Sequence, residues 1–149
     1  MASIDELRMR YAELNGIRPA STEFLDKIES LLELRLPRAF RLVCEFFDGA
    51  GIYTIPLFSL SGTAPRLNPL SETERLRIKV GLPKNYLVLA EPPASLIVMD
   101  CDGEGAITWL DAIDAERIGE RAFSRPPDCW HSFEEFFCYL LDEEFADRQ

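Results

Sequence analysis

Apolar residues recur at three- and four-residue steps in the first third of the chain, and each periodic run begins at a polar residue that can cap a helix. Ser3 and Glu6 form a capping box, and Gly16 ends the run that follows. Ser21 caps a second run. The pattern predicts two amphipathic helices, the second of which should bury a stripe formed by Leu25, Ile28, Leu31 and Leu32.

A third helix is expected to begin at Pro37, because proline has a φ angle suited to the first helical turn and needs no acceptor for an N–H there. Residues 34–36 should run extended, since proline disfavours helix at the preceding position. The glycines of Asp48-Gly49-Ala50-Gly51 should end the helix. Its buried side should consist of Phe40, Val43, Cys44 and Phe47, with Phe46 widening the apolar face.

After Gly51 the pattern changes to short β-branched and aromatic runs, which predict strands. Residues 52–55 and 57–60 are the first candidates, with Pro56 favouring an edge or a bulge. Runs 86–90, 96–99 and 106–110 follow with short connections, which predicts an antiparallel meander. Residues 100–105 join the last two. We interpret them as a hairpin turn rather than a calcium loop, because the terminal glutamate of a calcium loop is missing.

Residues 62–85 fit two structures. The alternation in residues 75–80 suits a strand, whereas Ser71-Glu72-Thr73-Glu74 is a capping box that favours a helix over the same residues. Ser132 opens a final helix that should bury Phe133, Phe136, Phe137, Leu140 and Leu141. The predicted fold class is therefore α+β: a single domain, residues 1–149, in which an antiparallel β-meander sheet packs with N-terminal helices and a C-terminal helix.

A chain of 149 residues that is 47% hydrophobic can bury one core without a metal or a disulfide. Its apolar runs are far shorter than the roughly 20 residues that span a bilayer. Its first ten residues show no secretory signal, so we expect a cytoplasmic protein. The cysteines form no CxxC pair, and with His131 they match no zinc module. We therefore expect no metal, no cofactor, and reduced structural thiols at Cys44, Cys101, Cys129 and Cys138.

Charge is distributed unevenly along the chain. Residues 1–48 carry seven basic and nine acidic side chains, residues 49–90 carry five and two, and residues 91–149 carry four and fifteen. The net values are −2, +3 and −11, which sum to the formal net charge of −10. Such a field repels nucleic acid and anionic membranes and attracts a basic partner, although an acidic surface also simply keeps a protein soluble.

Residues 20–49 carry a motif of helix, Leu-Pro, helix and Asp-Gly turn. It reads Ala20-Ser21 … Leu25-x-x-Ile28-Glu29-x-x-Leu32-x-Leu34-x-Leu36-Pro37-x-x-Phe40-x-x-x-x-x-Phe46-x-Asp48-Gly49. Leu82-Pro83 before the strand at 86–90 and the closing Ser132-Phe133-x-x-Phe136 continue it. The combination resembles the SUKH superfamily, with residues 20–145 as the family-like core and residues 1–19 as a helical extension. Glu33 stands where the family usually has glycine.

The resemblance implies a binding protein without catalytic activity. The superfamily includes fungal cell-wall-synthesis regulators and many bacterial proteins that give immunity to a toxin encoded beside them. The residues agree with the absence of catalysis: there is one histidine, no nucleophile elbow, no phosphate-binding glycine loop and no metal triad. We interpret His131 as a structural or surface residue rather than a catalytic one.

Four acids crowd the C-terminal end of the final helix, where the helix dipole disfavours negative charge. They are Asp142, Glu143, Glu144 and Asp147, and the pair Glu144 and Arg148 offers a partial offset. Two interpretations remain open: a fraying, solubilising terminus, or a surface that serves a cationic partner.

The leading hypothesis is an immunity protein that occludes a basic toxin domain, a nuclease being one case, since a nuclease groove must be basic to hold phosphate. The alternative is a regulatory or scaffolding module without a toxin. No direct binding of nucleic acid or membrane is expected, and the oligomeric state stays open. Trp109 could be core or contact. The candidate contact residues are Tyr53, Asp100, Asp102, Glu104, Trp109, Asp111 and Asp114.

Overall fold

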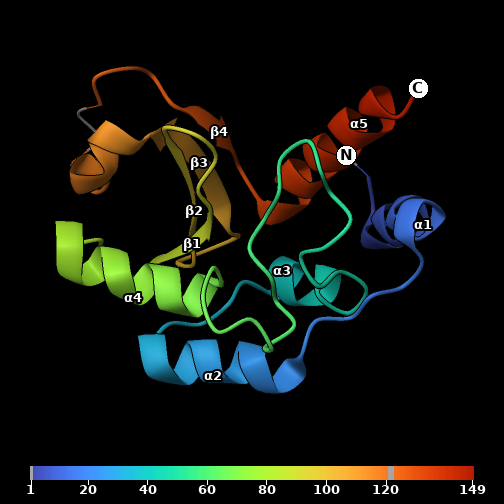
Figure 1. The fold of residues 1–149 in the computed structure, drawn as a ribbon, viewed down its shortest axis with the longest axis horizontal. Coiled ribbons are helices and arrows are strands. Elements are labelled where there is room, and N and C mark those ends of the chain that lie inside the picture. Colours follow the sequence, from blue (N-terminus) through green and yellow to red (C-terminus); the bar gives the residue numbers. More distant parts are fainter. Residues whose placement is uncertain (1, 121–122) are drawn as a thin grey trace.

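The computed structural model of the protein describes residues 2–120 and 123–149. Within these residues the chain forms helices, strands and one 3-10 helix, η1, and it confirms the predicted α+β fold class (Figure 1). The elements in chain order are α1 (Ile4–Asn15), α2 (Thr22–Leu32), α3 (Arg38–Val43), α4 (Pro69–Val80), β1 (Tyr86–Ala90), β2 (Ser95–Asp100), β3 (Ala106–Asp111), η1 (Ala112–Arg117), β4 (Asp128–Trp130) and α5 (Phe133–Asp147).

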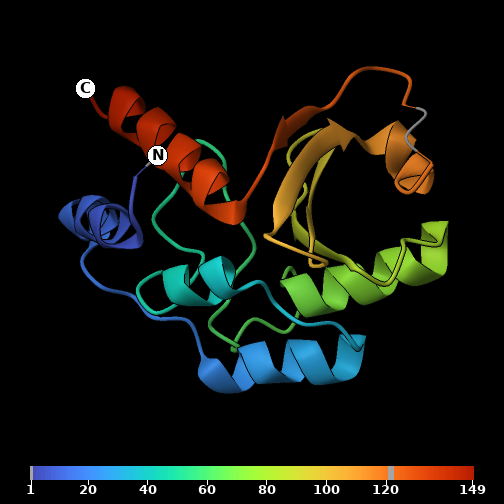
Figure 2. The same cartoon turned by 180° about the vertical axis from the view of Figure 1, so that it is seen from behind.

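The strands form one antiparallel sheet in the order β1-β2-β3-β4, so each strand pairs with its neighbour along the chain, as a meander requires. Both faces of the sheet are covered. Ile97 and Met99 of β2 belong to the main core, whereas the intervening Leu96 and Val98 belong to a second cluster with residues of α4 and η1. Figure 2 shows α4 and η1 on one side of the sheet and α1 and α5 on the other.

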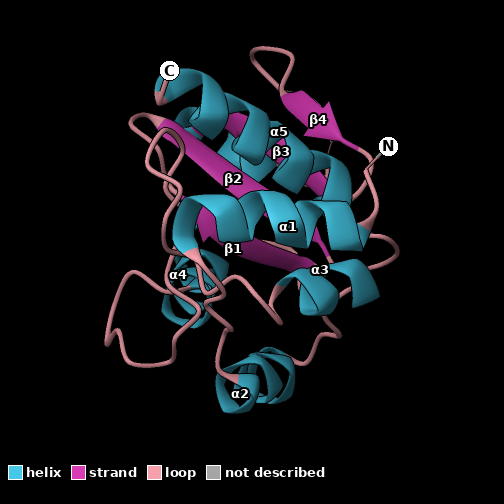
Figure 3. Ribbon diagram, turned by 90° about the vertical axis from the view of Figure 1, so that its right-hand side faces the viewer, coloured by secondary structure: helices cyan, strands magenta, loops and turns pink. Residues whose placement is uncertain are grey.

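Helices α1, α3 and α5 meet through aromatic rings. Tyr11 of α1 contacts Phe47 with 5.3 Å between ring centroids, and Phe47 contacts Phe137 of α5 at 4.9 Å. Phe40 of α3 contacts Phe133 at 4.8 Å. All five rings are fully buried. Figure 3 shows α1 and α5 lying across the same face of the sheet, which fixes α5 next to β3 and β4.

The predicted helix starts are confirmed at three helices. The hydroxyls of Ser3, Ser21 and Ser132 each accept a hydrogen bond from a backbone N–H in the first turn of α1, α2 and α5. The helix favoured over residues 72–80 is confirmed as α4, but its cap is Asn68 rather than Ser71. Pro69 follows this cap at the first helical position, where proline fits best.

Two details of the predicted helices are wrong. Leu31 is 57% exposed, and Phe24 takes its place on the buried side of α2. Helix α3 ends at Val43, earlier than the Asp48-Gly49 turn, and residues 44–46 form a turn that still buries Phe46. Glu33 closes α2 with a positive φ of 54°, which explains why glycine suits this position.

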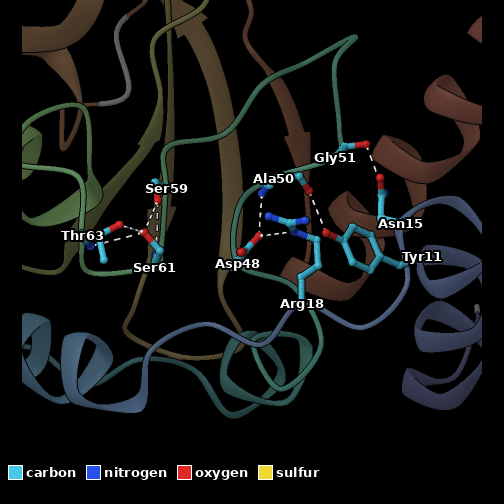
Figure 4. Close-up of polar contacts among 9 residues, drawn as sticks. All are labelled: Tyr11, Asn15, Arg18, Asp48, Ala50, Gly51, Ser59, Ser61 and Thr63. Carbon is cyan, nitrogen blue, oxygen red and sulfur yellow. Dashed lines mark hydrogen bonds and ion pairs between the residues drawn. The ribbon is translucent and has the colours of Figure 1, made fainter.

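The strands predicted at 52–55 and 57–60 are absent from the structure. Residues 48–60 form no regular strand pairing, and individual hydrogen bonds hold them in place. Tyr11 donates its hydroxyl proton to the Ala50 carbonyl at 2.8 Å, Asn15 donates to the Gly51 carbonyl at 3.2 Å, and the Leu60 N–H donates to the Asp48 carbonyl at 2.8 Å. Figure 4 shows the first two contacts together with the hydroxyl chain of Ser59, Ser61 and Thr63.

Candidate partner-binding site

Strand β4 and the neighbouring side of α5 place two aromatic rings among carboxylates. The Trp130 ring lies 5.1 Å from the Tyr139 ring and 4.9 Å from the Phe136 ring, and both Trp130 and Tyr139 are partly exposed. Glu135, Tyr139 and Glu143 follow one another at four-residue steps in α5, which puts them on one side of the helix. We call this set the acid–aromatic surface: Asp128 and Trp130 of β4, and Glu135, Tyr139 and Glu143 of α5.

The carboxylates act on the ring at the centre of this surface. Partial burial raises the pKa of Tyr139, and the negative charges of Glu143 and Asp128 raise it further, as does its hydrogen bond to Glu143. Glu135 accepts a hydrogen bond from the backbone N–H of His131 at 2.7 Å. Among the ion pairs of the described residues, none includes Asp128, Glu135 or Glu143.

The sequence-predicted residues do not gather at one place. Asp100, Asp102 and Glu104 lie at the β2–β3 turn, and the expected hairpin is confirmed there. The Asp100 carboxylate accepts hydrogen bonds from Asn85 at 2.8 Å and from the Asp102 N–H at 2.9 Å, so it shapes the turn. Glu104 is exposed and lines a hollow of about 260 Å³ that Glu134 and Arg38 also line.

Trp109 and Asp111 lie at the opposite end of β3. Trp109 packs partly against the main core and also lines a cleft of about 740 Å³ between residues 54–59 and the β1–β2 turn, so part of it is core and part stays accessible. Asp111 lies 3.6 Å from the guanidinium of Arg125. Tyr53 is 72% exposed, and the Arg148 guanidinium lies 5.7 Å from the centre of its ring.

Asp114 has to be removed from the candidate contact residues, because it is only 1% exposed. Ser124 donates to its carboxylate twice, from the hydroxyl at 2.7 Å and from the backbone N–H at 3.0 Å. The Ser124 hydroxyl contributes most to holding the pKa of Asp114 below its ordinary value, and the Arg117 guanidinium, 3.9 Å away, adds to the effect. Asp114 therefore fixes the chain after η1 rather than facing a partner.

The C-terminal acids also separate. Glu144 is 1% exposed and accepts hydrogen bonds from the backbone N–H groups of Tyr53 and Thr54 at 2.8 and 3.0 Å. Asp142 pairs with Arg10 of α1 at 2.6 Å, so a second arginine besides Arg148 compensates the negative charge at this helix end. Both interpretations are wrong for the buried Glu144, which ties α5 to residues 53 and 54, whereas Asp142 is exposed and ties α5 to α1. Glu143 and Asp147 are exposed.

A comparison with known families decides the relationship. The sequence model of the SMI1 / KNR4 family (SUKH-1) matches residues 19–138. The chain belongs to this family. The match begins close to the boundary expected at residue 20 and includes β4 and the first turns of α5. No curated protein matches the chain.

The cysteines of this SUKH-1 protein differ in burial. Burial raises the pKa of the Cys44 thiol, and burial with the charges of Asp100 and Asp102 raises the pKa of Cys101 to about 12. Cys129, which we expected to be a structural thiol, is exposed, and Cys138 is partly buried. Within residues 2–120 and 123–149, no three His, Cys, Asp or Glu side chains group closely enough to hold a metal ion, and no helix has the length and apolar character needed to cross a membrane.

The sequence signal for the acid–aromatic surface was incomplete. Glu135, Tyr139 and Glu143 stand at four-residue steps, so their shared side of the SUKH-1 protein's last helix could have been inferred. Asp128 and Trp130 join them because β4 pairs with β3, with Trp109 opposite Asp128 in the register. A three-residue strand that follows two prolines carries no periodic pattern from which this pairing could be predicted.

Proposed function

We propose that the protein is an immunity protein that binds a cognate bacterial toxin domain in the cytoplasm and neutralises it by occlusion, without catalysis. Membership of the SUKH-1 family supports a role in protein–protein interaction. The observation that carries the proposal is the acid–aromatic surface, where Asp128, Glu135 and Glu143 surround two partly exposed rings. Aromatic residues supply much of the energy of protein interfaces, and carboxylates that form no ion pair within the described part of the chain favour a basic partner.

The charge of the whole chain supports the same partner. A toxin that acts on nucleic acid needs a positively charged groove for phosphate. A protein with a net charge of −10, most of it contributed by residues 91–149, is attracted to such a groove over long range, which accelerates encounter. Rapid capture protects the cell that makes the toxin.

The test is co-expression with the toxin gene found next to the gene of this protein, followed by binding kinetics with the two purified proteins. We expect rescue of growth, a stable complex, and an association rate that falls at least tenfold between 20 and 300 mM salt, roughly the range over which screening removes long-range attraction. Rescue with an association rate independent of salt would remove the electrostatic part of the proposal.

A pair of matched variants locates the surface. Asp128→Lys with Glu143→Lys should weaken the complex by at least a hundredfold, because both carboxylates lie on the acid–aromatic surface. Glu23→Lys with Glu74→Lys changes the net charge equally at exposed positions of α2 and α4 and should weaken it by less than tenfold. Equal effects of the two pairs would place the contact elsewhere. No neighbouring toxin and no rescue would favour the regulatory or scaffolding alternative.

A further inference from the structure

Arginine recurs in this protein beside an aromatic ring and a carboxylate. In three places among the described residues, a guanidinium lies 5.4 to 5.7 Å from a ring centre and also pairs with an acid. The three sets are Arg8 with Phe46 and Glu45, Arg10 with Phe145 and Asp142, and Arg148 with Tyr53 and Glu144. The arrangement joins a cation–π contact to an ion pair.

The acid–aromatic surface has the rings and the carboxylates of this arrangement but no guanidinium from the described residues. The rings of Tyr139 and Trp130 lie 5.1 Å apart, Glu143 follows Tyr139 by one helical turn of α5, and Asp128 precedes Trp130 by two residues of β4. Neither acid pairs with a cation of residues 2–120 or 123–149, whereas Asp142, next to Glu143 in the sequence, pairs with Arg10. The surface is thus complete except for the positive charge.

We propose that the partner supplies this charge as an arginine side chain, which docks against Tyr139 and Trp130 between Asp128 and Glu143. The proposal rests on the proposed function, because it names the group of the partner that the acid–aromatic surface recognises. The occupant is a partner rather than a symmetric second copy, because a two-fold dimer through this surface would bring Asp128, Glu135 and Glu143 against the same acids, and like charges in contact repel.

Arginine fits this surface better than lysine does. Its guanidinium is planar, so it can stack on a ring while its edge donates two hydrogen bonds to a carboxylate, and it is more weakly hydrated than an ammonium group. Lysine offers a compact charge that can satisfy a carboxylate but stacks poorly on the ring. The surface should therefore discriminate between two residues of equal charge.

The test is a titration of the protein with the peptide acetyl-Gly-Arg-Gly-amide, followed by the indole N–H signals of the two tryptophans in NMR spectra. Trp130 should shift more than Trp109, because the Trp130 ring contacts Tyr139, whereas Trp109 lines the cleft near residues 54–59. The lysine peptide should bind at least threefold more weakly. The citrulline peptide, which keeps the shape of arginine without its charge, should give no shift at Trp130.

Variants separate the site from general attraction to an acidic protein. Tyr139→Leu and Glu143→Gln should each weaken binding of the arginine peptide at least fivefold. Tyr53→Leu is the matched control, since it removes an exposed ring whose guanidinium is already supplied by Arg148. A citrulline peptide that shifts Trp130 equally, or a Tyr139→Leu variant that binds as the wild type does, overturns the inference. Capture of the toxin by a protein that does not discriminate among these peptides would overturn it while leaving the proposed function intact.

Discussion

Replacing the buried Glu144 of α5 by alanine should strongly destabilise the protein. Its buried carboxylate accepts four hydrogen bonds, from the backbone N–H groups of Tyr53 and Thr54, from the Thr54 hydroxyl at 3.2 Å and from Arg148 at 3.0 Å. Removing one member of a buried charged pair costs about 3 to 5 kcal/mol. Tyr53 and Thr54 are exposed, so water can satisfy their N–H groups in part, and we expect about 3 kcal/mol.

The assay is urea unfolding at pH 7, followed by tryptophan fluorescence. Asp147→Ala is the matched control, because it removes an exposed carboxylate from the last turn of the same helix and should change the free energy of unfolding by less than about 0.5 kcal/mol. A loss of about 3 kcal/mol corresponds to a fall in Tm of roughly 10 °C for a chain of this length. Equal stabilities of the two variants would refute the reasoning.

The dependence on pH adds an independent check. Burial acts to raise the pKa of Glu144, but the hydrogen bonds from Thr54, Tyr53 and Arg148 outweigh it, so the net pKa lies below the ordinary value. A carboxylate whose pKa is lower in the folded state stabilises that state above its unfolded pKa, about 4.3 for glutamate, and loses this effect as the pH falls through the folded pKa. The difference between wild type and Glu144→Ala should therefore shrink in acid.

Four further changes test the fold. Gly49→Ala should cost more than about 3 kcal/mol in urea unfolding, because a Cβ there would lie 2.5 Å from the Phe58 carbonyl oxygen at a φ of 94°. Glu33→Gly should raise the free energy of unfolding by about 1 kcal/mol, since φ is positive at this helix end. Ser132→Ala should lose about 1 kcal/mol of stability by removing the α5 cap. Tyr11 has a pKa raised to about 12 by burial, so its stabilisation is full below pH 10 and is lost as the pH rises through 12; Tyr11→Phe should abolish that part of the alkaline loss.

Local chemistry explains why so much of the fold could be predicted. Ser3, Ser21 and Ser132 cap helices because the hydroxyl and the N–H that it accepts from belong to neighbouring residues. The meander strands were recognisable because runs of buried residues alternate with short turns. In residues 52–60 the same β-branched composition predicted strands that do not form. Their backbone N–H groups bond instead to Glu144 and to the Leu89 carbonyl, which come from distant parts of the chain.

The candidate site was harder to predict, because sequence does not show which acids face solvent. Asp111 and Asp114 are three residues apart, yet Asp111 keeps part of its surface exposed while Asp114 is enclosed by the Ser124 segment that folds back over η1. The turn around Asp102 and Glu104 could be identified because a hairpin turn must face outward. The pairing of β4 with β3 could not, and it is this pairing that brings Asp128 to α5.

Three consecutive acids of α5 show how one helix end can serve both the fold and a partner. Successive residues of an α-helix point about 100° apart, so Asp142, Glu143 and Glu144 face three different neighbours. Asp142 meets Arg10 of α1, Glu144 meets the backbone of residues 53 and 54, and Glu143 is left beside Tyr139. Stability and binding should therefore separate between adjacent positions. Glu144→Ala should lower the free energy of unfolding, whereas Glu143→Gln should weaken binding of the partner and leave the free energy of unfolding unchanged. Urea unfolding and the dissociation constant of the complex, measured on both variants, test this.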